Sequence, residues 1–168
     1  MGRRELMGYD SPDTKFPTIS KSVTSRKVTL NGNHLIYEGT NTSTSTAYIV
    51  YKDGTVSQTR PTDIWWGYDI GDYLEVYLRN VKVWNTNNSS KSMVINWADT
   101  LSTSNAFALT VNIPANSNDL LISDVSTTYG PTSTERKFGG LMLGYHTNWN
   151  GLKVEGDLYI FKNGKRIL

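Results

Sequence analysis

The chain has 168 residues, 19% of them charged, and its formal net charge at pH 7 is +2. This length fits one domain with a sizeable core, and the weak charge with only short basic runs argues against a nucleic acid partner. The chain has no cysteine, so it can form neither a disulfide framework nor a thiolate metal site.

Residues 1–22 form the first predicted unit. They contain Pro12, Pro17 and two glycines without sustained periodicity, which predicts an extended arm. The arm carries more apolar material than a solvating tail needs, so we expect it to dock on a neighbouring subunit or partner protein. A β pattern begins at Val23, and residues 23–168 are predicted to form a single β domain.

Four pairs of residues favour tight hairpin turns. Asn-Gly and Asp-Gly are the strongest short hairpin signals, because both central residues of a type I′ turn need positive φ. The four pairs are Asn31-Gly32, Asp53-Gly54, Asn150-Gly151 and Asn163-Gly164. Repeated signals of this kind predict antiparallel pairing.

The longest predicted strand starts near Tyr73. Leu74, Val76 and Leu78 alternate with polar or aromatic residues, which is typical of a half-buried strand. At Arg79-Asn80 the alternation slips by one residue, because the next apolar residues are Val81 and Val83. Such a slip sends side chains to the opposite face unless a β-bulge absorbs it, so we expect a bulge there.

The remaining segments complete a β fold. No window of eleven residues has convincing helical periodicity, so little or no helix is expected. Ser126–Thr134 is predicted to be a loop. The fold class predicted is all-β, an antiparallel two-sheet β-sandwich, jelly-roll-like, with about ten short strands and an extended N-terminal arm. Other strands are expected within Thr44–Tyr51, Val56–Thr59, Lys91–Trp97, Phe107–Ile113, Leu120–Val125, Phe138–His146 and Leu152–Ile160.

The search for catalytic chemistry finds no motif. His34 and His146 have no spacing that would make a metal site with Asp or Glu, and each is read as a surface or strand histidine. Glu155 and Asp157 form the nearest carboxylate pair, but alternation places both on one solvated sheet face. Asp63, Asp69 and Asp72 could supply oxygen ligands, although they match no EF-hand, and calcium is left open. We expect no catalytic residue, no metal ligand and no cofactor, and thus no enzyme.

Two aromatic segments are the better candidates for binding. Trp65-Trp66-Gly67-Tyr68 precedes the long strand, and Trp149 lies between Asn148 and Asn150. Adjacent residues of an extended chain point to opposite faces, so only one of the first two tryptophans easily enters a core. An exposed ring can stack on a sugar while amides bond its hydroxyls; the alternative is that the tryptophans plug the ends of the sandwich. The predicted binding residues are Trp65, Trp66, Tyr68, Asn148, Trp149 and Asn150.

The whole chain resembles small structural proteins of tailed bacteriophages. The features that carry this resemblance are the Asn-, Thr- and Ser-rich composition, the proline-containing arm and the terminal segment Leu158–Leu168. Baseplate, tail-tip and head-decoration components have this character, and the predicted sandwich is also similar to carbohydrate-binding modules. The resemblance implies assembly with its own subunits or other virion proteins, and contact with a host-surface glycan.

The expected location is the virion, assembled in the host cytoplasm. The N-terminus lacks the apolar segment of a signal peptide, and no apolar run approaches the roughly 20 residues that span a bilayer. The main prediction is therefore a non-enzymatic virion structural, decoration or tail-associated protein that assembles through its arm. Two alternatives stay open: a carbohydrate-binding module that uses the loop aromatics, and a small β-sandwich hydrolase, which no motif favours.

Overall fold

The computed structural model describes residues 19–23, 26–39, 47–50, 56–57, 66–68, 70–99, 105–131, 133, 136–143, 151–166 and 168. The described part of the chain contains fourteen strands and no helix. Every strand pair is antiparallel. The prediction of an all-β antiparallel fold is confirmed.

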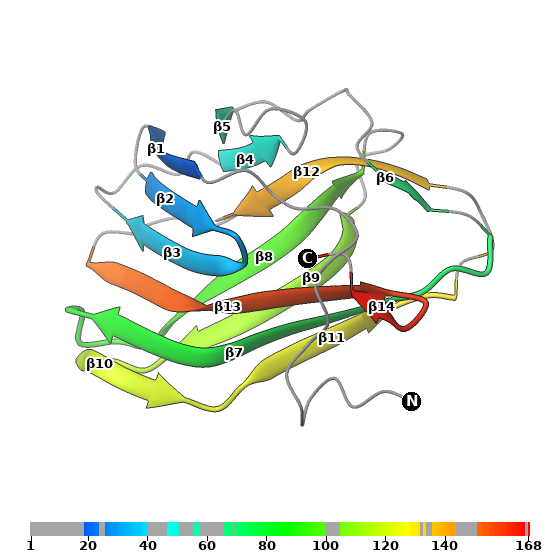
Figure 1. Cartoon of the computed structure of the whole chain (residues 1–168). Helices are drawn as coiled ribbons and strands as arrows, with labels where there is room; N and C mark the ends of the chain where they lie inside the picture. The colour runs from blue at the N-terminus through cyan, green and yellow to red at the C-terminus, as the bar shows by residue number, and fades with distance from the viewer. Residues whose placement is uncertain are drawn as a thin grey trace.

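The first of two sheets contains eight strands (Figure 1). Their bounds are β1 Ile19–Val23, β2 Arg26–Asn31, β3 His34–Gly39, β7 Leu74–Asn85, β10 Ser117–Ile122, β11 Val125–Tyr129, β13 Leu152–Lys162 and β14 Lys165–Arg166. The strand order is β1-β2-β3-β13-β7-β10, with β11 also beside β7 and β14 beside β13. The longest two strands, β7 and β13, therefore lie at the centre of the sheet.

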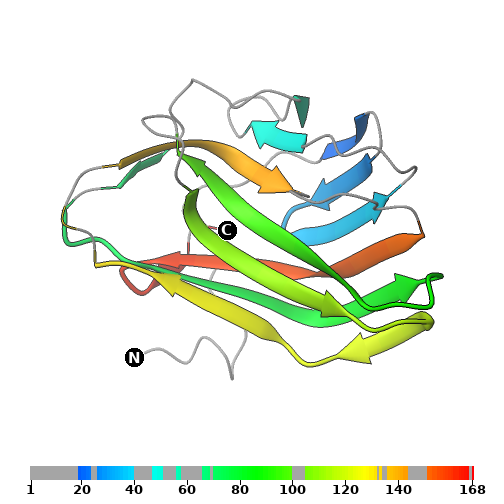
Figure 2. The same cartoon turned by 180° about the vertical axis from the view of Figure 1, so that it is seen from behind.

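The second sheet contains six strands. Their bounds are β4 Ala47–Val50, β5 Val56–Ser57, β6 Trp66–Tyr68, β8 Lys91–Asp99, β9 Asn105–Ile113 and β12 Arg136–Leu143. The order is β5-β4-β12-β8-β9, with β6 also beside β12. In Figure 1, β13 and β7 lie in front of β8 and β9, and the reverse view of Figure 2 brings β8 and β9 to the front.

The chain passes repeatedly from one sheet to the other. Consecutive strands belong to different sheets at six steps, among them β6 to β7 and β11 to β12. The other four pairs are β3 and β4, β7 and β8, β9 and β10, and β12 and β13. Within the sheets these strands have matching orders, β3-β13-β7-β10 in the first and β4-β12-β8-β9 in the second. Strands that are neighbours along the chain therefore lie at corresponding positions of the two sheets.

One hydrophobic cluster draws on both sheets. Leu78 and Leu158, from the central strands of the first sheet, are fully buried, as are Met93 and Val111 of the second. The alternation of side chains along each strand explains which residues are buried, because every second side chain of a strand points to the same face. On β9, for example, Leu109, Val111 and Ile113 are buried, whereas Ala108, Thr110 and Asn112 are exposed.

The predicted bulge lies at the centre of β7. Glu155 pairs with Lys82 and Asp157 with Arg79, so the two residues Asn80 and Val81 oppose the single residue Gly156. Asn80 has a φ of 54°, the left-handed conformation that asparagine tolerates better than most residues. The bulge restores the alternation, since Leu78 before it and Val81 after it are both fully buried. The prediction from the slip in the apolar pattern is confirmed.

Two of the predicted hairpin turns are described completely. Asn163 (φ 53°) and Gly164 (φ 81°) connect β13 to β14, as a type I′ turn requires. The hairpin between β2 and β3 is also present, but its turn residues are Gly32 and Asn33, because Asn31 already pairs with His34. Strands β4 and β5 pair on either side of Asp53-Gly54, which itself lies outside the described residues.

Two local predictions are wrong. Asn150-Gly151 does not join paired strands, because β12 before it and β13 after it belong to different sheets. Of the predicted loop Ser126–Thr134, residues 126–129 belong to strand β11, since they pair with β7. Of the predicted arm, residues 1–18 lie outside the described part of the chain, and residues 19–22 are within β1.

Candidate functional site

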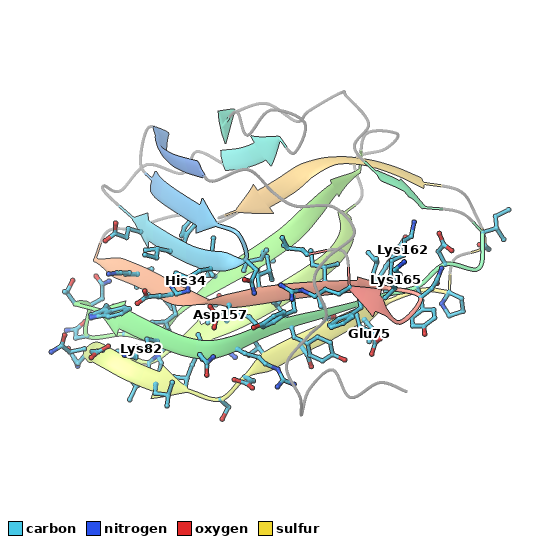
Figure 3. All side chains as sticks on the ribbon, viewed as in Figure 1. His34, Glu75, Lys82, Asp157, Lys162 and Lys165 are labelled. Atoms are coloured by element: carbon cyan, nitrogen blue, oxygen red, sulfur yellow. The ribbon has the colours of Figure 1, made fainter. Side chains whose placement is uncertain are left out.

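The face of the eight-stranded sheet that points away from the hydrophobic cluster is rich in charged and aromatic side chains. We call it the outer face; Figure 3 looks onto it. Its residues alternate with the buried ones on the two central strands and stand opposite one another in the register. The opposed pairs are Lys153 and Trp84, Glu155 and Lys82, Asp157 and Arg79, and Tyr159 and Tyr77.

His34 lies between two carboxylates on this face. Its Nδ1 is 2.8 Å from Oδ1 of Asp157, and its Nε2 is 2.9 Å from Oε2 of Glu155. The register of β3 on β13 explains the contacts, because His34 pairs directly with Asp157 and Glu155 is two residues away on the same face. About a quarter of each carboxylate side chain is exposed, against 44% of the histidine.

The geometry determines the protonation state of His34. Ionised carboxylates only accept hydrogen bonds, so both ring nitrogens must carry a proton to donate to them. The hydrogen bond to Asp157 is the main cause that raises the pKa of His34 above its ordinary 6.5; partial burial opposes it, and the hydrogen bond to Glu155 and the two negative charges add to the increase. These contacts favour the protonated form of His34, which links β3 to β13.

The cluster continues into the bulge of β7. Nδ2 of Asn80 donates to Oδ2 of Asp157 at 3.0 Å, so this carboxylate accepts bonds from both β3 and β7. The backbone N–H of Asn80 donates to Oδ1 of Asp124 at 3.2 Å, and Nε of Arg79 lies 3.8 Å from the other oxygen of Asp124. The bulge residue Asn80 thus donates to two aspartates, Asp157 on β13 and Asp124 between β10 and β11.

Aromatic rings with cations beside them flank the cluster. Nζ of Lys153 lies 4.4 Å from the centre of the Trp84 ring, within the range of a cation–π interaction. The guanidinium groups of Arg79 and Arg166 lie 5.6 Å and 5.0 Å from the rings of Tyr77 and Tyr159. All three rings are half-buried. The outer face therefore combines flat apolar surfaces with hydrogen-bonding groups in a fixed arrangement.

The carboxylates of the cluster and the Tyr77 hydroxyl are engaged in hydrogen bonds within the outer face. Glu155 and Asp157 do not face each other across a gap, as a glycosidase pair would, but share His34 as a common donor. A histidine that donates from both nitrogens has no lone pair to act as a base until it loses a proton and one of these bonds. The Tyr77 hydroxyl donates to Oε2 of Glu75 at 2.8 Å, which fixes another carboxylate on the same face.

The sequence predicted part of this site. Alternation correctly placed Glu155 and Asp157 on one sheet face, but their contact with His34 was missed because 121 and 123 residues separate the partners. The only usable signal was the polar position of His34 directly after a hairpin turn. Which strand would lie beside β3 could not be read from it.

The predicted aromatic site is only partly within the described residues. Trp65, Asn148, Trp149 and Asn150 lie outside them. Trp66 and Tyr68 are not in a loop: they lie in β6, where Trp66 pairs with Phe138 and Tyr68 with Arg136 of β12. The expectation of a loop was wrong because ladder pairing with β12 extends the strand structure to these residues.

The described residues include neither a cluster of metal-ligating side chains nor a membrane-spanning helix. Over the described ranges, no three His, Asp or Glu side chains are arranged to hold a metal ion. Of the three aspartates considered for calcium, Asp72 accepts a hydrogen bond from Nδ2 of Asn163 at 2.7 Å, and the other two lie outside the described residues. The described part of the chain includes no helix with the length and hydropathy needed to cross a membrane.

Comparison of the chain with protein families, with curated proteins and with solved structures finds no match.

Proposed function

We propose that the two sheets form a β-sandwich of the jelly-roll type. A jelly roll has eight strands in two sheets, with the chain wrapped so that successive strands alternate between them. The matching orders β3-β13-β7-β10 and β4-β12-β8-β9, joined by four sheet-to-sheet steps, support this topology. Strands β1, β2 and β5 are then additions at the edges.

We propose further that this module is a binding protein without catalytic activity, and that it works as a structural or tail-associated component of a virion. The matching strand orders of the two sheets are the observation that carries the proposal, because capsid and lectin domains are common users of the jelly-roll fold. The Asn-, Thr- and Ser-rich composition and the proline-containing arm support the same role. The internally paired charges around His34 support recognition in place of catalysis.

Mass spectrometry of purified virus particles tests this role. Particles from the source lysate should contain the chain at an abundance comparable with other structural proteins, after washing with high salt removes surface contaminants. A chain that stays in the host-cell fraction and is absent from washed particles contradicts the proposal. Genes for capsid, portal or tail proteins beside its own gene would add support.

The N-terminal arm is proposed to mediate assembly. A variant that lacks residues 1–18 keeps β1 intact and should remain folded, yet it should no longer incorporate into particles. The measurement is co-sedimentation of the truncated and full-length proteins with particles that lack the native chain. Equal incorporation of both forms contradicts a role for the arm, and loss of the folded state is checked by circular dichroism.

A second proposed function is glycan binding, favoured by the rings of Trp84, Tyr77 and Tyr159 on one face. Aromatic rings stack on the apolar faces of sugars, and neighbouring polar groups bond the hydroxyls. Replacement of Trp84 by Ala should weaken binding to host-surface polysaccharide by about 1–3 kcal/mol. The matched control is Ile70→Ala, because Ile70 is an apolar residue that is 71% exposed and lies in the turn before β7.

The tryptophans that the sequence predicted to bind provide the contrasting test. Trp65, Trp66 and Trp149 are replaced by Ala one at a time, and thermal unfolding is measured beside polysaccharide binding. Replacement of a core tryptophan should cost about 3–5 kcal/mol of fold stability. Replacement of a contact residue should leave the melting temperature unchanged and weaken binding. If all three variants unfold early, a binding surface formed by these tryptophans is excluded and the outer face remains.

A further inference from the structure

Strand β10 is an open edge of the eight-stranded sheet. It pairs with β7 on one side, and among the strands that the structure describes none pairs with its other side. The backbone N–H and C=O groups on such a side are free to bond another strand. Natural edge strands are normally protected by charges or bulges, because an open apolar edge invites pairing with a second chain.

The apolar residues of this edge are unusually accessible. Leu120 is 41% exposed and Leu121 is 64% exposed, although adjacent side chains of a strand point to opposite faces. The register assigns the faces: Leu121 pairs with the exposed Lys82, whereas Leu120 and Ile122 pair with the buried Val83 and Val81. Both faces of the edge therefore offer apolar contacts.

The open segment has a defined length. The pairing of β10 with β7 shifts between Ser117 and Leu120, where Asp119 has a φ of 53°. On the other side, Ser123 and Asp124 separate β10 from β11. Only Leu120, Leu121 and Ile122 are left as a regular apolar run between two acidic positions. A run this short cannot support unlimited strand addition, but it can specify one partner.

We propose that β10 of one copy of this chain pairs antiparallel with β10 of a second copy, about a two-fold axis at Leu121. The run is symmetric about Leu121, so this register sets Leu121 opposite Leu121 of the second copy and Leu120 opposite Ile122. Asp119 then stands opposite Ser123, and Asp124 opposite Asn118. Each apolar residue meets an apolar residue, and no carboxylate stands directly opposite another.

Other antiparallel registers of the two β10 strands would place less compatible residues opposite one another. Directly opposed residues of an antiparallel pair have their side chains on the same face, so the neighbouring registers are centred on Leu120 or on Ile122. The first sets Asp119 opposite Leu121, and the second sets Asp124 opposite Leu120, so each replaces an apolar pair by a carboxylate against a leucine. The register centred on Leu121 avoids both mismatches. It also creates a closed dimer, because a two-fold contact uses the same surface on both copies.

On the outer face of the proposed dimer, side chains of the two copies form one continuous row across the strands. Glu155, Lys82 and Leu121 of one copy would be followed by the same residues in reverse order from the other. Nζ of Lys82 lies 3.5 Å from Oδ1 of Asp119, so the lysine is already drawn toward the edge. Its methylene stem can cover the leucine pair. The contact does not depend on whether the protein works in a virion.

Disulfide trapping tests the register directly. The chain has no cysteine, so a single introduced cysteine reports only contacts with another copy. Directly opposed residues of antiparallel strands have Cα atoms about 4.5–5.5 Å apart, which suits a disulfide. Leu121→Cys should therefore form a covalent dimer under mild oxidation, whereas Leu120→Cys and Ile122→Cys should cross-link only when mixed with each other. The control Ile70→Cys, at a comparably exposed position, should stay monomeric.

Sedimentation velocity tests the contact without a covalent link. A short edge contact is expected to be weak, so the full chain is examined from about 10 µM to about 1 mM. Leu121→Lys opposes two ammonium groups at the axis and should raise the dissociation constant at least about tenfold, whereas Ile70→Lys should leave it unchanged. A chain that is monomeric throughout, or an equal effect of both variants, overturns the proposal. Cross-linking of Leu120→Cys alone in place of Leu121→Cys would also overturn it.

Discussion

Gly156 lies directly against the backbone carbonyl of Arg79. A Cβ atom at residue 156 would stand 3.1 Å from that oxygen and 3.1 Å from Cδ1 of Leu78. The bulge creates this approach, because Asn80 and Val81 share Gly156 as their only partner on β13. The glycine is thus required by the close approach of two strands.

Replacement of Gly156 by Ala should destabilise the fold. The added methyl group meets backbone on one side and a buried leucine on the other, so one strand must shift, at an expected cost of about 1–3 kcal/mol. Urea unfolding measures the change. Ser126→Ala, at an exposed position of β11, is the control and should change the free energy of unfolding by less than about 0.5 kcal/mol. Equal stability of Gly156→Ala and wild type would show that the strands can separate without cost.

Asn85 is a fully buried polar residue at the end of β7. Its Nδ2 donates to the carbonyl of Ser89 at 3.0 Å and to that of Pro114 at 3.1 Å, and its Oδ1 accepts the backbone N–H of Asn87 at 2.9 Å. The amide therefore joins the loops that follow β7 and β9. An aspartate of the same shape would direct an oxygen, and not a donor, at the two carbonyls.

Replacement of Asn85 by Asp should cost about 3 kcal/mol of stability at neutral pH, because a buried charge would face acceptors. The cost should shrink as the pH falls, since the neutral carboxyl group can donate one hydrogen bond. Thermal unfolding between pH 4 and pH 7 measures both effects. Asn112→Asp, at an exposed position of β9, is the matched control and should stay close to wild type. A loss of stability that does not depend on pH would point to packing instead.

Asn163 has two functions in the last hairpin turn. Its φ of 53° requires a residue that tolerates the left-handed conformation, and its side chain accepts the N–H of Tyr73 at 3.1 Å and donates to Asp72 at 2.7 Å. Asn163→Gly keeps the backbone conformation and loses the side-chain bonds, whereas Asn163→Ala loses both. The alanine variant should therefore be less stable than the glycine variant by about 1 kcal/mol. Equal melting temperatures would mean that the turn conformation contributes little.

His34 should make stability depend on pH. Its pKa is raised in the folded state, mainly by the hydrogen bond to Asp157, so the stabilisation is fully present below the ordinary pKa of 6.5 and is lost as the pH rises through the higher folded value. His34→Gln should reduce stability at pH 6 and matter less at pH 9. Because 44% of the side chain is exposed, the difference should be on the order of 1 kcal/mol or less.

Two measurements check the role of His34. Urea unfolding of wild type and His34→Gln across this pH range gives the free energies, and NMR titration of the imidazole protons gives the pKa in the folded state. Assignment of the resonance uses its disappearance in His34→Gln. A folded pKa at or below 6.5, or a stability difference that grows toward high pH, would contradict the imidazolium bridge.

The sequence by itself determined the features that depend on near neighbours. The alternation of Leu74, Val76 and Leu78 predicted the buried face of β7, and the slip at Arg79-Asn80 predicted the bulge. The turn at Asn163-Gly164 also followed from two adjacent residues. In each case a period of two residues, or the φ preference of one residue, is a local property of the chain.

Only the tertiary structure decided which strands meet. The contact of His34 with Asp157 depends on β3 lying beside β13, and Asn150-Gly151 failed as a hairpin because β12 and β13 joined different sheets. The polar segment Val125–Tyr129 is a strand because its backbone pairs with β7. The alternation of apolar and polar residues shows that a strand has a buried face, but it does not show which strand lies beside it. Pairing between strands more than a hundred residues apart is therefore decided by how all the strands bury their apolar faces together.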